Sequence, residues 1–271
     1  MVRHDRREVL SLMLTPRQRA LLQGRRLYAP LGISGRVRRA TKAQRLAIPD
    51  SVVDNFETSD ANPPGVYEDG ESISDYYSGD TEEFSRTTTD AIEGGHSLNI
   101  TNPQFWQRIY SFPGEGLPRY PEKGEKISAL LRDDGGESEP GFMYGFEDDD
   151  GTLKGYSAEI GTRENAVVIR RIDDLNGESQ TILLDDDVGT ISANTIYELE
   201  VQWHDGSGSE SDGTHEYTLY TVDQDLARDT EIGSGSTTDT NYDGRGVGWG
   251  GFNSSTDEGT GDLLQVLGGV D

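Results

Sequence analysis

The sequence predicts an all-β protein, a two-sheet antiparallel sandwich that follows a short, partly helical basic arm. Beyond residue 52, apolar residues alternate with polar ones, which is the period of a strand with one buried face. Clusters of Gly, Asn, Asp and Pro interrupt the alternation every eight to fifteen residues, as turns between short strands do. No helical period separates these segments, so two packed sheets are the expected architecture.

Ten segments carry the clearest strand pattern. In chain order they are Leu98–Ile100, Trp106–Phe112, Ile127–Leu131, Phe142–Phe146, Ala166–Ile172, Thr181–Leu184, Ile196–Trp203, Tyr217–Val222, Val247–Phe252 and Leu263–Leu267. Trp203 alternates with Leu199 and Val201, and Trp249 alternates with Val247. Both indole rings are therefore expected on the core side of their strands.

The chain is strongly acidic, with 50 Asp and Glu against 24 Lys and Arg and a formal net charge of −26 over 271 residues. In 1 M salt the Debye length falls to about 3 Å, which screens the self-repulsion of such a charge. We therefore expect a protein adapted to high salt. The alternation argues against a disordered acidic chain, cysteine is absent, and no window approaches the roughly 18 apolar residues of a membrane span.

Residues 1–48 are expected to be a docking arm, separate from a sandwich at 52–271. The arm carries eleven Arg and Lys42 against Asp5 and Glu8, a charge of +10, which leaves −36 for residues 49–271. Val9–Leu14 predicts a short helix, and Thr15-Pro16 is typical of the start of a second one. The arm has too few apolar residues to fold alone, so we expect it to become ordered against a partner.

The predicted docking residues are the arginine and apolar side chains of the arm. They are Arg17, Arg19, Leu21, Leu22, Arg25, Arg26, Tyr28, Arg36, Arg38 and Arg39. Bidentate Arg–carboxylate pairs and buried Leu and Tyr side chains keep their geometry in high salt, whereas phosphate binding driven by counterion release weakens steeply. The expected partner is therefore a protein, and neither nucleic acid nor a membrane is expected.

Several strand segments resemble laminin-G/concanavalin A-like jelly-roll domains over about residues 52–271. The segments are Val53-Asp54-Asn55-Phe56-Glu57, Phe84–Thr87, Gly94–Ile100, Tyr197–Trp203, Tyr217–Tyr220 and Gly246–Phe252. The resemblance implies a jelly-roll sandwich of the lectin and glucanase type, and it specifies the fold better than the function. Leu263–Val266 stands where such domains often end in a pair of aspartates.

The sequence lacks the residue patterns of catalysis. Sandwich glycosidases of this fold place two carboxylates on one strand face in a Glu-x-Asp-x-x-Glu pattern, and no stretch matches it. Glu147–Asp150 comes closest, but Gly151 follows it, so a turn is expected there. Glu198 and Glu200 are expected on the solvent face of their strand. No Gly-x-Ser-x-Gly motif is present, and we expect that the protein is not an enzyme.

Tyrosines in polar loops are the predicted glycan-binding residues, because sugars stack their C–H faces on exposed aromatic rings. They are Tyr76, Tyr77, Tyr120 and Tyr242. No cofactor is predicted, and calcium stays open because Asp148 and Asp150 supply loop oxygens. His204 and His215 flank a Gly/Ser-rich loop, where they are either a metal-binding pair or ordinary residues at strand ends.

These features together predict a structural protein on the surface of a halophilic archaeal virus particle, such as a capsid turret, decoration protein or tail fibre. The arm would anchor it to other virion proteins within a homo-oligomeric assembly, and the sandwich would face outward to host surface glycans. A secreted haloarchaeal carbohydrate-binding module and a glycan hydrolase remain as alternatives. The retained basic arm argues against the first alternative, and the missing carboxylate pattern argues against the second.

Overall fold

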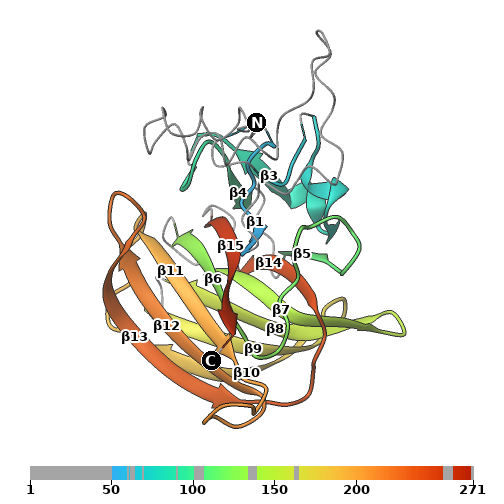
Figure 1. Ribbon diagram of the computed structural model, residues 1–271, viewed down its shortest axis with the longest axis vertical. Coiled ribbons are helices and arrows are strands. Elements are labelled where there is room, and N and C mark those ends of the chain that lie inside the picture. The colour runs from blue at the N-terminus through green and yellow to red at the C-terminus, as the bar shows by residue number, and fades with distance from the viewer. Residues whose placement is uncertain are drawn as a thin grey trace, which may run out of the picture. The chain divides into compact units, whose positions relative to one another are not determined.

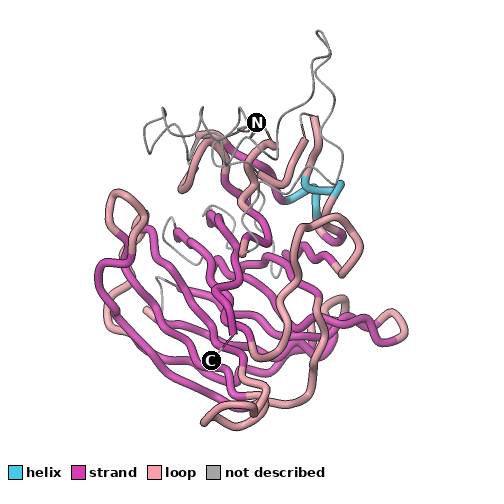
Figure 2. Tube along the Cα trace, in the orientation of Figure 1, coloured by secondary structure: helices cyan, strands magenta, loops and turns pink. Residues whose placement is uncertain are grey.

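The computed structural model describes residues 51–59, 61, 65–68, 70–89, 91–100, 107–133, 139–161, 165–252 and 259–269. The predicted arm, its ten docking residues from Arg17 to Arg39, and Trp106 lie outside the described residues. The described part is an antiparallel two-sheet β-sandwich with two short 3-10 helices, η3 (Ile73–Asp75) and η4 (Thr81–Glu83) (Figures 1 and 2). This confirms the predicted all-β class and fits a jelly-roll sandwich.

The first sheet has eight strands in the order β13-β12-β11-β6-β15-β4-β3, and β1 also pairs with β15. Its strands are β1 (Val52–Asp54), β3 (Phe84–Thr87), β4 (Ser97–Ile100), β6 (Glu125–Asp133), β11 (Ile196–Trp203), β12 (Thr214–Val222), β13 (Arg228–Thr238) and β15 (Gly259–Gly269). Since β15 lies between β6 and β4, the end of the chain forms part of the centre of this sheet.

The second sheet has seven strands in the order β10-β9-β8-β7-β14-β5-β2. Its strands are β2 (Ser78–Gly79), β5 (Gln107–Ser111), β7 (Glu139–Asp149), β8 (Thr152–Gly161), β9 (Ala166–Asp174), β10 (Ser179–Asp187) and β14 (Gly246–Phe252). The late strand β14 lies between β7 and β5, so distant parts of the chain meet at the centre of this sheet too.

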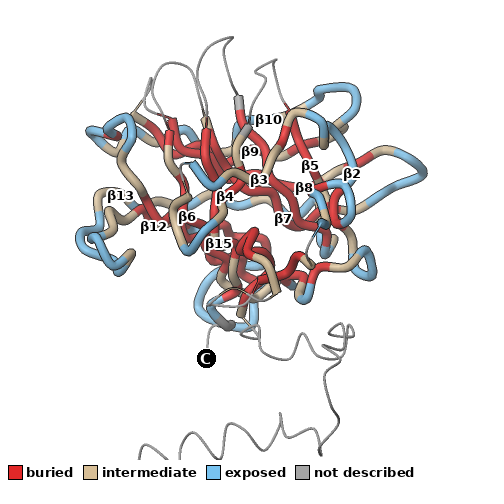
Figure 3. Tube along the Cα trace, turned by 90° about the horizontal axis from the view of Figure 1, so that it is seen from above, coloured by how far each residue is buried: buried red, intermediate tan, exposed pale blue. Residues whose placement is uncertain are grey.

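The core lies between the two sheets and is rich in aromatic rings. Trp203 and Trp249 are fully buried, as predicted, and buried segments follow the strands while exposed ones concentrate in the turns (Figure 3). The Tyr144 hydroxyl on β7 lies 2.9 Å from His215 Nδ1 on β12, which joins the sheets across the core. Burial lowers the pKa of His215 to about 4, so this imidazole is neutral at pH 7.

Candidate functional site

The end of the seven-stranded sheet at β5 and β2 contains the candidate site, and part of the site lies on the outer face, turned away from the sandwich core. On β5, Ile109 points into the core, so its neighbours Arg108 and Tyr110 point to this outer face. Part of this outer face is apolar and buried rather than exposed to solvent. Met143, Phe146, Leu153 and Ile172 form a second buried cluster there, against which Tyr110, Phe112 and Leu175 pack.

Glycines make room for charged side chains on the outer face. The strand register places Arg108, Gly250, Gly141 and Glu159 side by side across four strands. A Cβ atom on Gly250 would lie 3.0 Å from Arg108 Cγ, and one on Gly141 would lie 2.6 Å from Glu159 Cγ. The two long side chains therefore occupy the space that the glycines leave open.

A buried ionic cluster follows from this arrangement. Arg170 Nε donates to Glu159 Oε2 over 2.9 Å, and its Nη2 donates to Glu139 Oε2 over 2.8 Å. Ser157 Oγ donates to Glu159 Oε1 over 2.8 Å. Burial lowers the pKa of Arg108 to about 10 against the opposing charge of Glu159, so Arg108 is charged at neutral pH.

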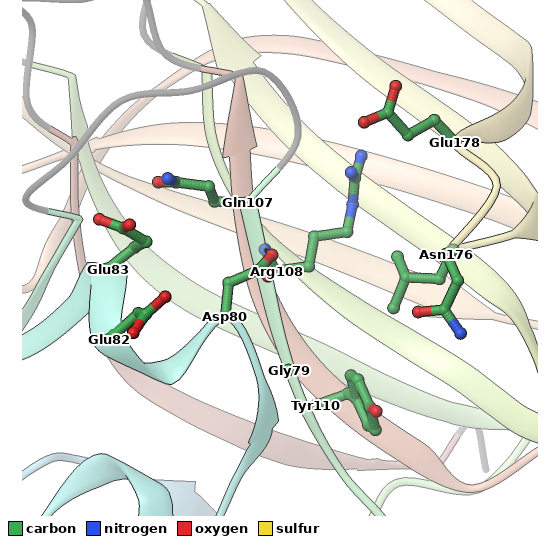
Figure 4. A pocket seen from close by; sticks show the side chains of 10 residues that line it. Gly79, Asp80, Glu82, Glu83, Gln107, Arg108, Tyr110, Asn176 and Glu178 are labelled. Atoms are coloured by element: carbon green, nitrogen blue, oxygen red, sulfur yellow. Dashed lines mark hydrogen bonds between the residues drawn. The ribbon is translucent and has the colours of Figure 1, made fainter.

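A polar cavity of about 380 Å³, here called the β5 pocket, opens beside this cluster. Its lining residues come from β2, η4, β5 and the turn between β9 and β10: Gly79, Asp80, Glu82, Glu83, Gln107, Arg108, Tyr110, Leu175, Asn176 and Glu178 (Figure 4). Four carboxylates and one guanidinium line the cavity. Its size suits a small polar ligand.

Gln107 is the unusual residue of the β5 pocket. It is only 6% exposed, and its amide oxygen is buried without a hydrogen-bond partner in the part of the chain that the structure describes. Figure 4 shows Gln107 and Arg108 leaving β5 in opposite directions, Gln107 on the side of Glu83 and Arg108 on the side of Glu178. Asp80 Oδ2 accepts from the Arg108 backbone N–H over 3.0 Å, which fixes the start of η4 beside β5. A buried amide without a partner is uncommon in folded proteins.

The expected exposure of the loop tyrosines is wrong in three of four cases. Tyr76 and Tyr77 are each 4% exposed, and Tyr120 is 8% exposed. Their hydroxyls find internal partners: Tyr77 donates to Asp54 Oδ2 over 2.7 Å, Tyr76 to the Val66 carbonyl over 3.1 Å, and Tyr120 pairs with Ser111. These contacts allow polar loops to bury aromatic rings, which removes the exposed faces on which the glycan prediction depended.

Tyr242 is half-buried rather than exposed. Its hydroxyl donates to Asp173 Oδ1 over 2.7 Å, and its ring lies 5.7 Å from that of Tyr156. The four tyrosines are not brought together at one site; Tyr120 lines a separate cavity of about 250 Å³ with Arg119 and Arg245.

The predicted calcium residues lie in the turn between β7 and β8, where a turn was expected. Asp148 Oδ1 accepts from the Gly151 N–H over 2.6 Å, and Asp150 adopts a positive φ of 52°. The two histidines have different partners. His204 Nε2 lies 3.3 Å from Glu216 Oε2, whereas His215 Nδ1 lies 2.9 Å from the Tyr144 hydroxyl. Within the described ranges, no group of three or more His, Asp or Glu side chains is placed to hold a metal ion.

Glu198 and Glu200 lie on the face of β11 that points away from the core, as predicted, but cations cover them. Arg228 donates to both oxygens of Glu198 at 2.8 Å and also pairs with Glu200, which Lys126 contacts over 2.7 Å. Both carboxylates, expected in contact with solvent, are therefore buried in ion pairs with Arg228 and Lys126. No described helix is long and apolar enough to cross a membrane.

No protein-family model matches the sequence, and no curated protein matches it significantly. Solved structures give distant matches. The carbohydrate binding module CBM66 from Bacillus subtilis is 13% identical, with 67% of this chain and 93% of that chain covered and a TM-score of 0.43. The marine PL-14 alginate lyase from Aplysia kurodai is 9% identical over 69% and 88%, with a TM-score of 0.47. The mannose- and Ca²⁺-bound exoplasmic/lumenal domain of VIP36 is 8% identical over 81% and 89%, with a TM-score of 0.48.

Proposed function

We propose that the sandwich binds carbohydrate and that the β5 pocket receives an uncharged sugar residue. The observation that carries this proposal is a polar cavity lined in part by Gln107, whose buried amide oxygen has no hydrogen-bond partner among the described residues. A half-turn about the last torsion of Gln107 exchanges its amide oxygen and nitrogen, and a sugar hydroxyl can both donate and accept. Sugar binding would therefore supply the missing hydrogen bond.

The charge of the pocket selects against an anion at this position. Asp80, Glu82, Glu83 and Glu178 outnumber the single Arg108 among the lining residues. Carboxylates accept hydrogen bonds from sugar hydroxyls, and the Tyr110 ring supplies apolar surface for C–H groups. Direct hydrogen bonds of this kind persist at salt concentrations that suppress long-range attraction.

We also infer a binding role rather than catalysis. The two carboxylates of the buried ionic cluster beside the pocket, Glu139 and Glu159, are both held by Arg170. A general acid must give up a proton to the leaving group, and two carboxylates bridged by a guanidinium have none to give. Hydrolysis assays on glycans that bind would test this inference, and turnover would contradict it.

The binding test compares variants of the β5 pocket with a surface control in molar salt. Isothermal titration of neutral oligosaccharides, chosen from a glycan panel, should detect binding to the wild type. Gln107→Ala and Asn176→Ala should each weaken it by roughly tenfold, the cost of about one lost hydrogen bond. Glu210→Ala, on the exposed loop 205–212, should bind as the wild type does. Unchanged affinity in both pocket variants would refute the site.

We further propose that the basic arm docks the protein into the particle of a halophilic archaeal virus, with the sandwich facing outward. The +10 charge of residues 1–48 beside −36 on the rest of the chain supports an arm that pairs with carboxylates of other structural proteins. Deleting residues 1–48 should leave a folded, soluble sandwich that no longer joins its assembly. Co-purification and cross-linking in molar salt test this, and normal incorporation of the truncated protein would refute it.

A further inference from the structure

A second, larger cavity adjoins the β5 pocket. It has a volume of about 640 Å³, and Glu82 lines both cavities, so η4 forms the partition between them. Serine and threonine hydroxyls line much of this second cavity: Ser72, Ser74, Thr81, Ser85 and Thr88. The contiguity gives the site room for more than one sugar residue.

The second cavity contains Arg86, whose charge acts on the buried Asp54 without forming an ion pair with it. Arg170 bridges two carboxylates, as do Arg171 and Arg228. Arg86, by contrast, makes no ion pair with any residue that the structure describes. In a chain with twice as many acidic as basic residues, a guanidinium without a carboxylate partner is unexpected.

Arg86 is also held in place. Its Nε donates to the Phe56 carbonyl over 2.7 Å, and its guanidinium stacks on the Tyr67 ring at 4.2 Å from the centroid. Its buried Nη2 has no hydrogen-bond partner among the residues that the structure describes. The charge is therefore fixed at the cavity by neutral contacts, which leaves its hydrogen-bonding capacity incompletely used.

The other charged groups of the cavity are consistent with an anionic ligand. The Glu71 carboxylate is already occupied, because Oε2 accepts from the Glu68 N–H over 2.6 Å and from the Tyr76 hydroxyl. His96 adds ring N–H capacity at the cavity wall, and its Nδ1 lies 3.4 Å from Glu57 Oε2. Only Glu82, at the partition, faces both cavities.

We propose that the ligand is an acidic oligosaccharide that spans η4, with an uncharged residue in the β5 pocket and a residue bearing a carboxylate or sulfate against Arg86 and His96 in the second cavity. This inference rests on the proposed carbohydrate binding. An anion beside Arg86 gains a charge-assisted hydrogen bond in a partly buried place, where salt screens less than at the surface. The surrounding hydroxyls hydrogen-bond the remaining oxygens of the acidic group.

The test compares ligands that differ only in the acidic group. Titration in molar salt would use galacturonate tetrasaccharides and their methyl esters as one pair, and sulfated and unsulfated galactose tetrasaccharides as the other. The wild type should bind the acidic member of at least one pair about tenfold more tightly, as expected for one charge-assisted hydrogen bond. The pair that shows the preference identifies the group.

Variants then locate the preference. Arg86→Gln should bind acidic and neutral members equally, whereas Arg245→Gln, which removes the same charge from an exposed ion pair with Glu122, should keep the preference. Thr88→Val, at an exposed position, should reduce the preference without disturbing the contacts of Arg86. Equal binding of both members by the wild type would overturn this inference while leaving carbohydrate binding intact. If the wild type bound none of these oligosaccharides, both this inference and the proposed carbohydrate binding would be overturned.

Discussion

At the scale of single residues, the site depends on positions where a side chain is absent. Gly141 and Gly250 leave the space in which Arg108 and Glu159 lie along the sheet. The alternation of apolar residues could not reveal this, because a glycine in a strand carries no sign of the face it occupies. Gln107 and Arg108 were missed for a related reason: a polar residue of a strand is expected in solvent, whereas both of these are buried, on opposite sides of β5.

We predict that Gly141→Ala destabilises the sandwich by about 1–3 kcal/mol, the usual cost of overpacking. The added Cβ would lie 2.4 Å from the Ala158 carbonyl oxygen and 2.6 Å from Glu159 Cγ. Gly208→Ala is the control, because a Cβ there meets nothing within 4 Å. Urea denaturation in molar salt measures both variants, and equal midpoints would contradict the packing argument.

At the scale of elements, the sequence predicted strands well where one face is wet and the other buried. It missed β8, β13 and the two-residue strand β2. Strand β8 is buried on both faces along most of its length. Its sequence does alternate, with Tyr156, Ala158 and Ile160 between Ser157 and Glu159, so this strand was open to prediction from the pattern. Strand β13 lies at a sheet edge with a Gly/Ser/Thr-rich sequence that is typical of loops. The ends of the other strands fall within a few residues of the prediction because turn residues mark them.

The short strand β1 is held by a buried carboxylate. Asp54 accepts from the Phe56 N–H over 2.9 Å, from Tyr77 over 2.7 Å and from Tyr67 over 3.2 Å. These bonds fasten the segment around η3 to the first strand. Burial outweighs them and raises the pKa of Asp54 from 3.8 to about 6.

The raised pKa predicts a pH dependence of stability between about pH 4 and 6. Over this range the folded state binds more protons than the unfolded state, so the free energy of unfolding falls as the pH rises. Asp54→Asn keeps an acceptor but cannot titrate, so its urea midpoint in molar salt should fall less than that of the wild type between pH 5 and 7. The exposed control Asp229→Asn should follow the wild type, and identical slopes for all three proteins would contradict the assignment.

At the scale of the whole molecule, acidic residues outnumber basic ones, and four of the described cations each contact two carboxylates. Arg170, Arg171 and Arg228 each bridge two carboxylates, and Lys123 contacts both Asp212 and Asp243. Each set of one cation and two carboxylates still carries a net negative charge. Local ion pairing therefore reduces the repulsion among carboxylates without removing it, and the rest must be screened by salt.

This balance predicts that the sandwich loses structure in dilute buffer. Residues 49–271 carry a formal charge of −36, and the Debye length grows from about 3 Å at 1 M salt to about 30 Å at 0.01 M. Circular dichroism and tyrosine fluorescence at falling salt should report cooperative unfolding. Acidifying the dilute sample toward the isoelectric point of about 4.4 should restore part of the signal, since protonation removes the repelling charges. A native spectrum retained in about 10 mM buffer at pH 7 would show that contacts within the sandwich outweigh the repulsion among its charges. The prediction that the protein is adapted to high salt would then be wrong.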